Sequence, residues 1–155
     1  MDRRPESSEY LEELSKYVDL VPAEGDIITI FREQTDEICT FISNLTEVGH
    51  LADTGRIMSY RLLCIARGDT TPLPGFEEKD YVLTANFEAH TLKALLAHYN
   101  LVRESTLLLM ETLPEEAWIR KGTVNEATLS ARAQACIMIG HDHHHLNILK
   151  DRYLG

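Results

Sequence analysis

Residues 130–153 read SARAQACIMIGHDHHHLNILKDRY, and this stretch is the strongest indication of the fold. Its apolar residues recur at spacings of three and four, which predicts one long helix. On a wheel of about 100° per residue, His141 and His145 lie one turn apart on the apolar stripe, so both imidazoles can reach a common point. His143 lies about 160° from the middle of that stripe and is expected in solvent, whereas His144 lies on its flank.

The same periodicity extends toward the N-terminus and predicts three further helices, over about Ile27–Ile42, Glu47–Ala66 and Leu92–Leu113. Asp26 suits an N-cap, and Gly68 suits the position just after a helix end. Residues 68–81, GDTTPLPGFEEKDY, are expected to form a long irregular loop, and Glu115–Trp118 a single turn. KGTVNEATLS, residues 121–130, is expected as a loop or a short extended pair.

Four amphipathic helices predict an all-α four-helix bundle, formed by a single domain over residues 1–155 with residues 1–25 as an N-terminal extension. The long connection between the second and third helices would let the bundle depart from simple up-down order.

Composition excludes several classes of function. Fifteen Lys and Arg against 25 Asp and Glu give a formal net charge of −10, which disfavours binding to nucleic acid. No stretch is long and apolar enough for a membrane span, and no signal peptide is visible, so a cytoplasmic protein is expected. Cys39, Cys64 and Cys136 are odd in number, and no motif around them indicates a disulfide, a zinc knuckle or a catalytic thiol.

The His141–His145 pair is a good platform for a divalent metal, because imidazole nitrogen suits Zn, Ni and similar ions. The alternative is a pair of core histidines bonded to neighbouring carboxylates or hydroxyls, but a small core rarely supplies such partners for both. A zincin-like reading with Asp142 as the acid is weaker, because Asp142 is shorter than Glu and lies at the edge of the stripe. His50, on an inward line of the second helix, is the best candidate for a third ligand. The other histidines, His90 and His98, lie among polar residues and are expected at the surface.

Three longer motifs are GHLADTGRIMSYRLLCIARGDTTPLPGFEEKDYV at 49–82, LPEEAW at 113–118 and IMIGHDHHHLNILKDRYL at 137–154. Together they resemble the DinB-like superfamily, in its YfiT-type metal-dependent hydrolase branch, over about Ile27 to the C-terminal end. The resemblance implies a four-helix bundle with a divalent metal held by three histidines, which are His50, His141 and His145 here.

One departure from the family concerns the first connection. Relatives carry an additional stretch before the GHL motif, whereas here FISNL, residues 41–45, runs almost directly into TEVGHLADT. The link is therefore a tight turn, or the first two helices are nearly continuous. A continuous helix would favour exchange between two chains. A homodimer that buries the first apolar stripe is therefore expected; the stripe includes Ile30, Phe31, Ile38 and Phe41.

Three neutral histidines leave a divalent cation with open coordination positions, which is typical of a catalytic metal rather than a structural one. Such a metal lowers the pKa of a bound water or thiol. The resemblance implies either a hydrolase or an S-transferase that uses a low-molecular-weight thiol and a second small-molecule substrate. Polar candidates for orienting water, accepting a proton or holding a substrate carboxylate are Asp53, Arg56, Tyr60 and His144. Arg56 also suits a surface salt bridge, and Asp53 also suits hydrogen bonding to a ligand imidazole. A metal-binding protein without turnover and a dimeric scaffold remain as alternatives.

Overall fold

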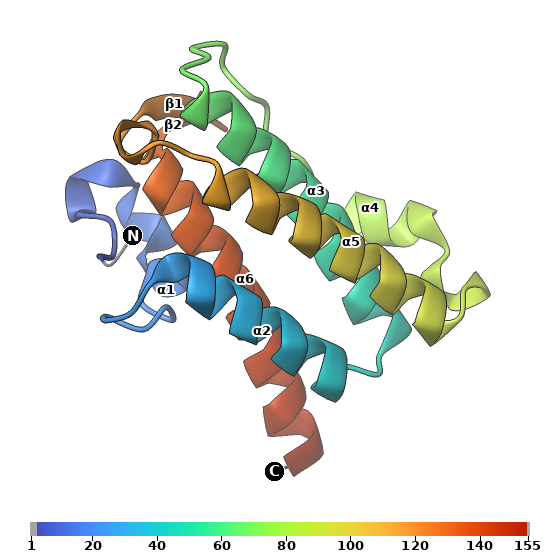
Figure 1. Cartoon of the computed structure of the whole chain (residues 1–155). Helices are drawn as coiled ribbons and strands as arrows, with labels where there is room; N and C mark the ends of the chain where they lie inside the picture. The colour runs from blue at the N-terminus through green and yellow to red at the C-terminus, as the bar shows by residue number, and fades with distance from the viewer. Residues whose placement is uncertain (1–2, 155) are drawn as a thin grey trace.

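The computed structural model describes residues 3–154, with side chains as far as residue 151. Its helices are α1 (Ser15–Val18), α2 (Ile27–Phe41), α3 (Leu45–Ala66), α4 (Glu78–Ala85), α5 (Leu92–Glu111) and α6 (Ala131–Leu154). Strands β1 (Lys121–Val124) and β2 (Ala127–Ser130) pair as an antiparallel hairpin. The four long helices α2, α3, α5 and α6 form a bundle (Figure 1), which confirms the predicted all-α fold.

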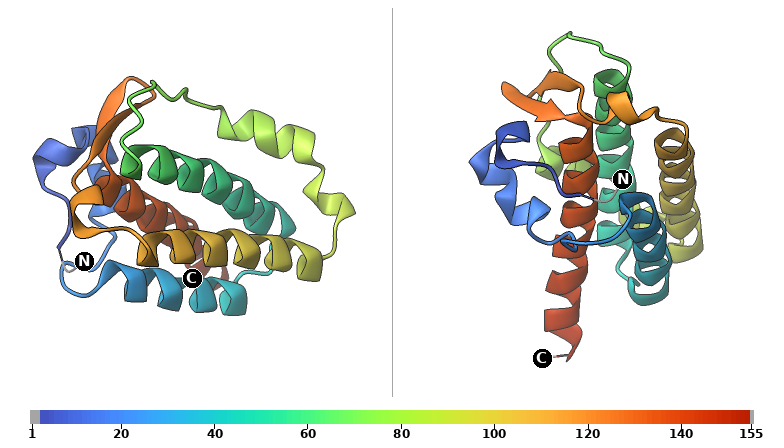
Figure 2. Two further views of the ribbon diagram at one scale, coloured as in Figure 1. Left: turned by 45° about the horizontal axis from the view of Figure 1, so that its top comes forward. Right: turned by 60° about the vertical axis from the view of Figure 1, so that its left-hand side comes forward.

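The order of the helices around the bundle differs from their order along the chain. α5 packs against both α2 and α3, and α6 also packs against both, so the consecutive helices α2 and α3 lie at opposite corners. The views agree that α3 and α5 run in the same direction, opposite to α2 and α6 (Figures 1 and 2). The long connection that carries α4 makes this parallel step possible, so the bundle does depart from simple up-down order.

The connection between α2 and α3 is a short turn. Asn44 has an extended backbone, and its side chain accepts a hydrogen bond from the Glu47 N–H at 3.0 Å, which starts α3. The alternative of one continuous helix is therefore wrong. α2 packs into its own bundle, where Phe31 and Ile38 are fully buried, although Phe41 remains 65% exposed. The apolar stripe thus no longer argues for exchange, and the homodimer stays a prediction.

Most predicted boundaries agree with the structure. The Asp26 carboxylate caps α2 by accepting from the Thr29 N–H at 3.0 Å, and Gly68 takes a φ of +77° just beyond α3. The extended pair is confirmed as the β1–β2 hairpin, whose turn residues Asn125 and Glu126 both have positive φ, as a tight hairpin turn requires.

α4 is a correction, because it lies in the segment expected to be an irregular loop. None of its residues is buried, so its sequence carries no apolar stripe that would have predicted a helix. It packs along α3 on the outside of the bundle (Figure 2).

Residues 3–25 cover the side of α6 that faces away from the bundle. α1 packs against α6, and Val18 and Val21 are each only 1% exposed. A Cβ on Gly140 would overlap the Tyr17 carbonyl group, so only glycine permits this close approach. As a result α6 is buried on two sides, and His143, which was expected in solvent, is partly buried with its Nδ1 3.2 Å from the Leu20 carbonyl oxygen.

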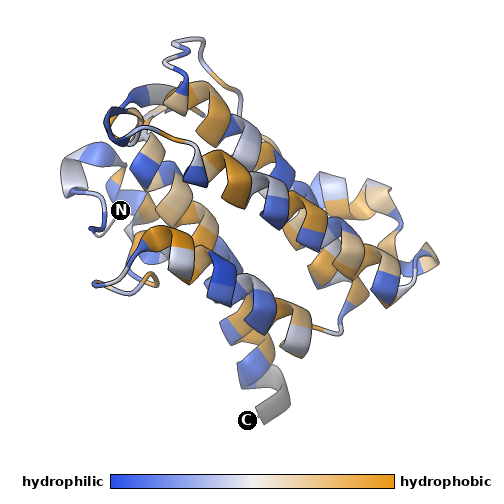
Figure 3. Cartoon of the chain, viewed as in Figure 1, coloured by the Kyte–Doolittle hydropathy of each residue, from blue (hydrophilic) through white to orange (hydrophobic). Residues whose placement is uncertain are grey.

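Each long helix carries both hydrophobic and hydrophilic residues (Figure 3). The buried apolar residues form two separate clusters. One cluster surrounds Phe31 and Leu62, and the other surrounds Leu51 and Tyr99. On each long helix, buried polar residues separate the two clusters: Gln34 on α2, Thr54 on α3, Arg103 on α5, and His141 and Asp142 on α6. Among the described helices, none is apolar over a length sufficient to cross a bilayer.

Candidate metal centre

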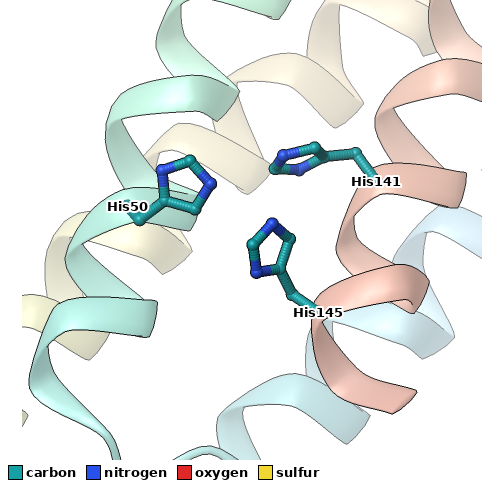
Figure 4. Close-up of side chains that lie close together, drawn as sticks. All are labelled: His50, His141 and His145. Atoms are coloured by element: carbon teal, nitrogen blue, oxygen red, sulfur yellow. The ribbon is translucent and has the colours of Figure 1, made fainter. Parts of the chain in front are cut away.

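Three histidines converge at the level of this polar layer. His50 comes from α3, and His141 and His145 come from adjacent turns of the neighbouring helix α6 (Figure 4). Each offers one ring nitrogen, and these nitrogens all lie within 4.8 Å of one another. We call these three residues the histidine triad. The structure thus brings together the three side chains that the sequence and the resemblance had selected.

The packing of α3 places the first of these histidines. Gly49 lies directly against the ring of Phe87, which a Cβ at this position would overlap. The missing side chain therefore lets the segment after α4 pack closely on α3, beside His50. His50 itself is 7% exposed.

A hydrogen-bonding group lies beside the Nδ1 of each triad ring. The carboxylate of Glu47 accepts from His145 Nδ1 at 2.8 Å, while Asp142 Oδ1 and Thr54 Oγ1 lie 3.4 Å from the Nδ1 atoms of His141 and His50. A carboxylate or hydroxyl on one ring nitrogen is the usual companion of a metal bond through the other nitrogen. These contacts therefore leave the Nε2 atoms for a common ligand.

Asp142 connects the triad to the buried polar layer. Its Oδ2 accepts from the Tyr99 hydroxyl at 2.7 Å and from Arg103 Nη1 at 3.1 Å. Burial acts to raise the pKa of Asp142, but the hydrogen bond from His141 and the charge of Arg103 outweigh it and hold the pKa below its usual value. An ionised Asp142 favours an Nδ1–H on His141, so its Nε2 carries a lone pair.

The triad fits a divalent cation on two further observations. The Nε2 of His141 is buried without a hydrogen-bond partner within the described residues, and His141 is only 1% exposed. Burial, followed by the neighbouring His145 and His141, lowers the pKa of His50, which favours the neutral imidazole that binds metals. Three neutral imidazoles suit Zn, Ni and similar ions.

Two cavities with almost entirely different linings reach this centre. The outer groove has a volume of about 450 Å³ and is lined by Thr46, Glu47, His50, Glu78, Lys79, Val82, Leu83 and His145. The inner cavity has a volume of about 250 Å³ and includes His141, Arg61 and Gln134 in its lining. Glu78 lines both cavities.

Glu78 was not a candidate in the sequence analysis. Its carboxylate oxygens lie 3.8 Å from His50 Nε2 and 3.9 Å from His141 Nε2. The only sequence signal was an acidic pair, Glu77–Glu78, in a segment that had not been recognised as helical.

The polar candidates from the sequence lie elsewhere. Asp53 and Arg56 form an ion pair with 3.7 Å between them, and Arg56 lines a surface cavity against α5. Tyr60 is 57% exposed, and none of these three residues lines the two cavities at the triad. His144 is exposed, with its ring centroid 5.6 Å from that of His145.

The cysteines stand apart from the site. All three are free thiols; Cys136 and Cys64 are buried and Cys39 is partly buried. Burial raises the pKa of the Cys136 thiol to about 12, and burial also raises that of Cys39. These shifts disfavour the thiolate form that a nucleophilic cysteine requires.

Comparison with known proteins agrees with this architecture. A search among curated proteins gives no match. A solved structure, YfiT from Bacillus subtilis, covers 97% of this chain and 93% of its own, with a TM-score of 0.69 at 15% sequence identity. It is described as "a probable metal-dependent hydrolase with an unusual four-helix bundle topology". The family profile "DinB superfamily" matches residues 26–149, and the chain therefore belongs to the DinB superfamily.

Proposed function

We propose that the chain is a metal-dependent enzyme whose histidine triad holds one divalent cation, with Zn or Ni as the expected metal. The observation that carries this proposal is the convergence of three ring nitrogens beside two cavities. One of these nitrogens is buried and has no hydrogen-bond partner among the described residues. When bound, the cation would act as a Lewis acid and lower the pKa of a coordinated water or thiol.

The surrounding residues have separate roles in this proposal. Glu47, Asp142 and Thr54 fix the orientation of the three imidazoles through their Nδ1 atoms. The outer groove presents the apolar side chains Val82 and Leu83 beside the triad, so it suits a substrate with an apolar portion.

Two reaction classes are compatible with this arrangement. A hydrolase requires one organic substrate and water, in agreement with the description of the YfiT structure. The presence of two cavities, one lined by His50 and His145 and the other by His141, favours the second class. This class is an S-transferase in which a low-molecular-weight thiol and an electrophile enter separately. In the inner cavity, Arg61 offers a guanidinium to a carboxylate of the thiol substrate.

The experiment begins with protein purified without an affinity tag or chelator and analysed for bound metals. About one divalent ion per chain is expected, with nitrogen-rich ligation in X-ray absorption. A chain that binds no divalent metal, or one that binds it through sulfur, would refute the proposal.

Metal-loaded protein is then tested with ester and amide substrates, and separately with thiol and electrophile pairs. The matched controls are His145→Ala, which removes a triad nitrogen, and His143→Ala, which removes an imidazole from the same helix outside the triad. Turnover lost in the first variant and kept in the second supports the enzyme, and the substrate set identifies the class. Metal binding without turnover in either set would favour the non-catalytic metal-binding alternative.

A further inference from the structure

Glu78 occupies the side of the histidine triad that the two helices α3 and α6 leave open. Its two carboxylate oxygens face different rings, with Oε2 3.8 Å from His50 Nε2 and Oε1 3.9 Å from His141 Nε2. The Nδ1 atoms of the same two rings already face Thr54 and Asp142, so the Nε2 atoms are the nitrogens that remain for a metal.

These distances do not fit a hydrogen-bonded cluster. At roughly 3.6 Å or more, nitrogen and oxygen are too far apart for a hydrogen bond. Among the described residues, His141 Nε2 is buried without a hydrogen-bond partner. A buried polar atom of this kind costs free energy unless a partner is present. The Glu78 carboxylate and the imidazoles of His50 and His141 therefore surround a common point without hydrogen bonds to one another.

The distances are close to those between ligands of one ion. Metal–ligand bonds of about 2.1 Å place two ligands roughly 3.0–3.4 Å apart in octahedral or tetrahedral geometry. A movement of Glu78 by about half an ångström would bring its carboxylate into this range.

The position of Glu78 in the fold allows such a movement. It is the first residue of α4, a helix with no buried residues, and its own side chain is 44% exposed. Glu78 also lines both the outer groove and the inner cavity, so the same side chain borders the two. A carboxylate in this position could leave a bound metal when a substrate enters either cavity.

We infer that Glu78 is a fourth protein ligand of the metal, displaceable by substrate, which α4 carries to the open side of the triad. This inference rests on the proposed function, because it requires that the triad binds a metal. A three-histidine, one-carboxylate shell adds a negative charge and an oxygen ligand that the triad alone lacks.

The test compares Glu78→Gln with Glu77→Gln. Both variants remove one negative charge from adjacent exposed or half-exposed positions, but only Glu78 faces the triad. Circular dichroism first verifies that both variants fold as the unchanged protein does. Zn affinity is then measured by competition with a chromogenic chelator, and the visible absorption spectrum is recorded with Co²⁺ in place of Zn.

Glu78→Gln is expected to lower Zn affinity by roughly tenfold or more. Substitution of a residue that only hydrogen-bonds to a metal ligand already causes a loss of this size, and loss of a ligand should cost at least as much. It should also change the Co²⁺ spectrum, whereas Glu77→Gln should leave both unchanged. Equal affinities in the two variants, or a loss of affinity with an unchanged Co²⁺ spectrum, would overturn the ligand assignment alone. Absence of Zn and Co²⁺ binding in the unchanged protein would overturn both this inference and the proposed function.

Discussion

Replacement of Arg103 by Met tests the buried polar layer that supports the metal centre. Arg103 is 2% exposed, and its guanidinium donates to Asp142 Oδ2 at 3.1 Å, to the Phe31 carbonyl at 2.7 Å and to Gln34 Oε1 at 2.9 Å. Met preserves much of the aliphatic volume but leaves the Asp142 carboxylate buried without its cationic partner. Removal of one member of a buried ion pair costs about 3–5 kcal/mol, a large share of the roughly 5–15 kcal/mol that stabilises a typical domain.

The matched control is Arg32→Met. Arg32 of α2 also bonds a carboxylate on the neighbouring helix α5, that of Glu111 at 2.7 Å, but its side chain is half exposed. Such a surface pair contributes about 0–1 kcal/mol, so this variant should be nearly as stable as the unchanged protein. Both variants remove one ion pair, so the expected difference in their free energies of unfolding comes from the burial of the pair.

Urea unfolding in the presence of a chelator measures both free energies without a contribution from bound metal. The double variant Arg103→Met with Asp142→Asn should be less destabilised than the sum of the two single variants, because the uncompensated charge is gone. A cost for Arg103→Met as small as that of Arg32→Met would refute the reasoning, and so would strict additivity in the double variant.

The remaining predictions concern metal binding, pH and assembly. Replacing any histidine of the triad with Ala should lower metal affinity by orders of magnitude in a chelator competition, whereas His143→Ala should leave it nearly unchanged; equal losses would mean that the cluster binds like a flexible tag. Burial acts to raise the pKa of Glu9, but hydrogen bonds from Arg132 and Ser130 outweigh it and hold the pKa below the ordinary 4.5. The ionised carboxylate therefore stabilises the fold above pH 4.5, and this contribution disappears as pH falls through the lower folded pKa. Urea unfolding should show Glu9→Gln less stable than the unchanged protein at pH 7 and the difference shrinking below pH 4.5; a difference independent of pH would contradict this. Of the apolar stripe on α2, Phe41 remains 65% exposed and is the part that a second chain could still cover. For a homodimer, sedimentation at micromolar concentration should give about twice the chain mass of 17.6 kDa, and a species at the chain mass alone would contradict it.

Much of the architecture was predictable because most helices bury one face. Periodicity located α2, α3, α5 and α6 to within a few residues, and the wheel placed His141 and His145 together. It failed for α4, since a helix that buries nothing carries no periodic signal. The wheel also placed His143 in solvent, because it assumed that α6 has one buried side and could not anticipate the N-terminal segment on the other.

The metal centre was predictable only in part. A single helix determines the relation between residues four apart, but the pairing of His50 with α6 depends on which helices become neighbours. Its inward line made His50 the best candidate for a third ligand, and the resemblance then assigned it to one site with His141 and His145. Glu78 could not have been found by either route, because its place depends on how the crossover segment settles on α3.

The arrangement of the long helices has a consequence for the order in which the protein is assembled during synthesis. α6 follows α2, α3 and α5 along the chain, yet it packs against both α2 and α3, which lie at opposite corners of the bundle. Until α6 leaves the ribosome, α5 is the long helix of the nascent chain that packs against both α2 and α3. At that stage Arg103 has no contact yet with the Asp142 carboxylate, and His50 has none with His141 and His145. In the proposed function, a metal would bind all three histidines only after α6 has packed, so the complete three-histidine site would form after the bundle folds.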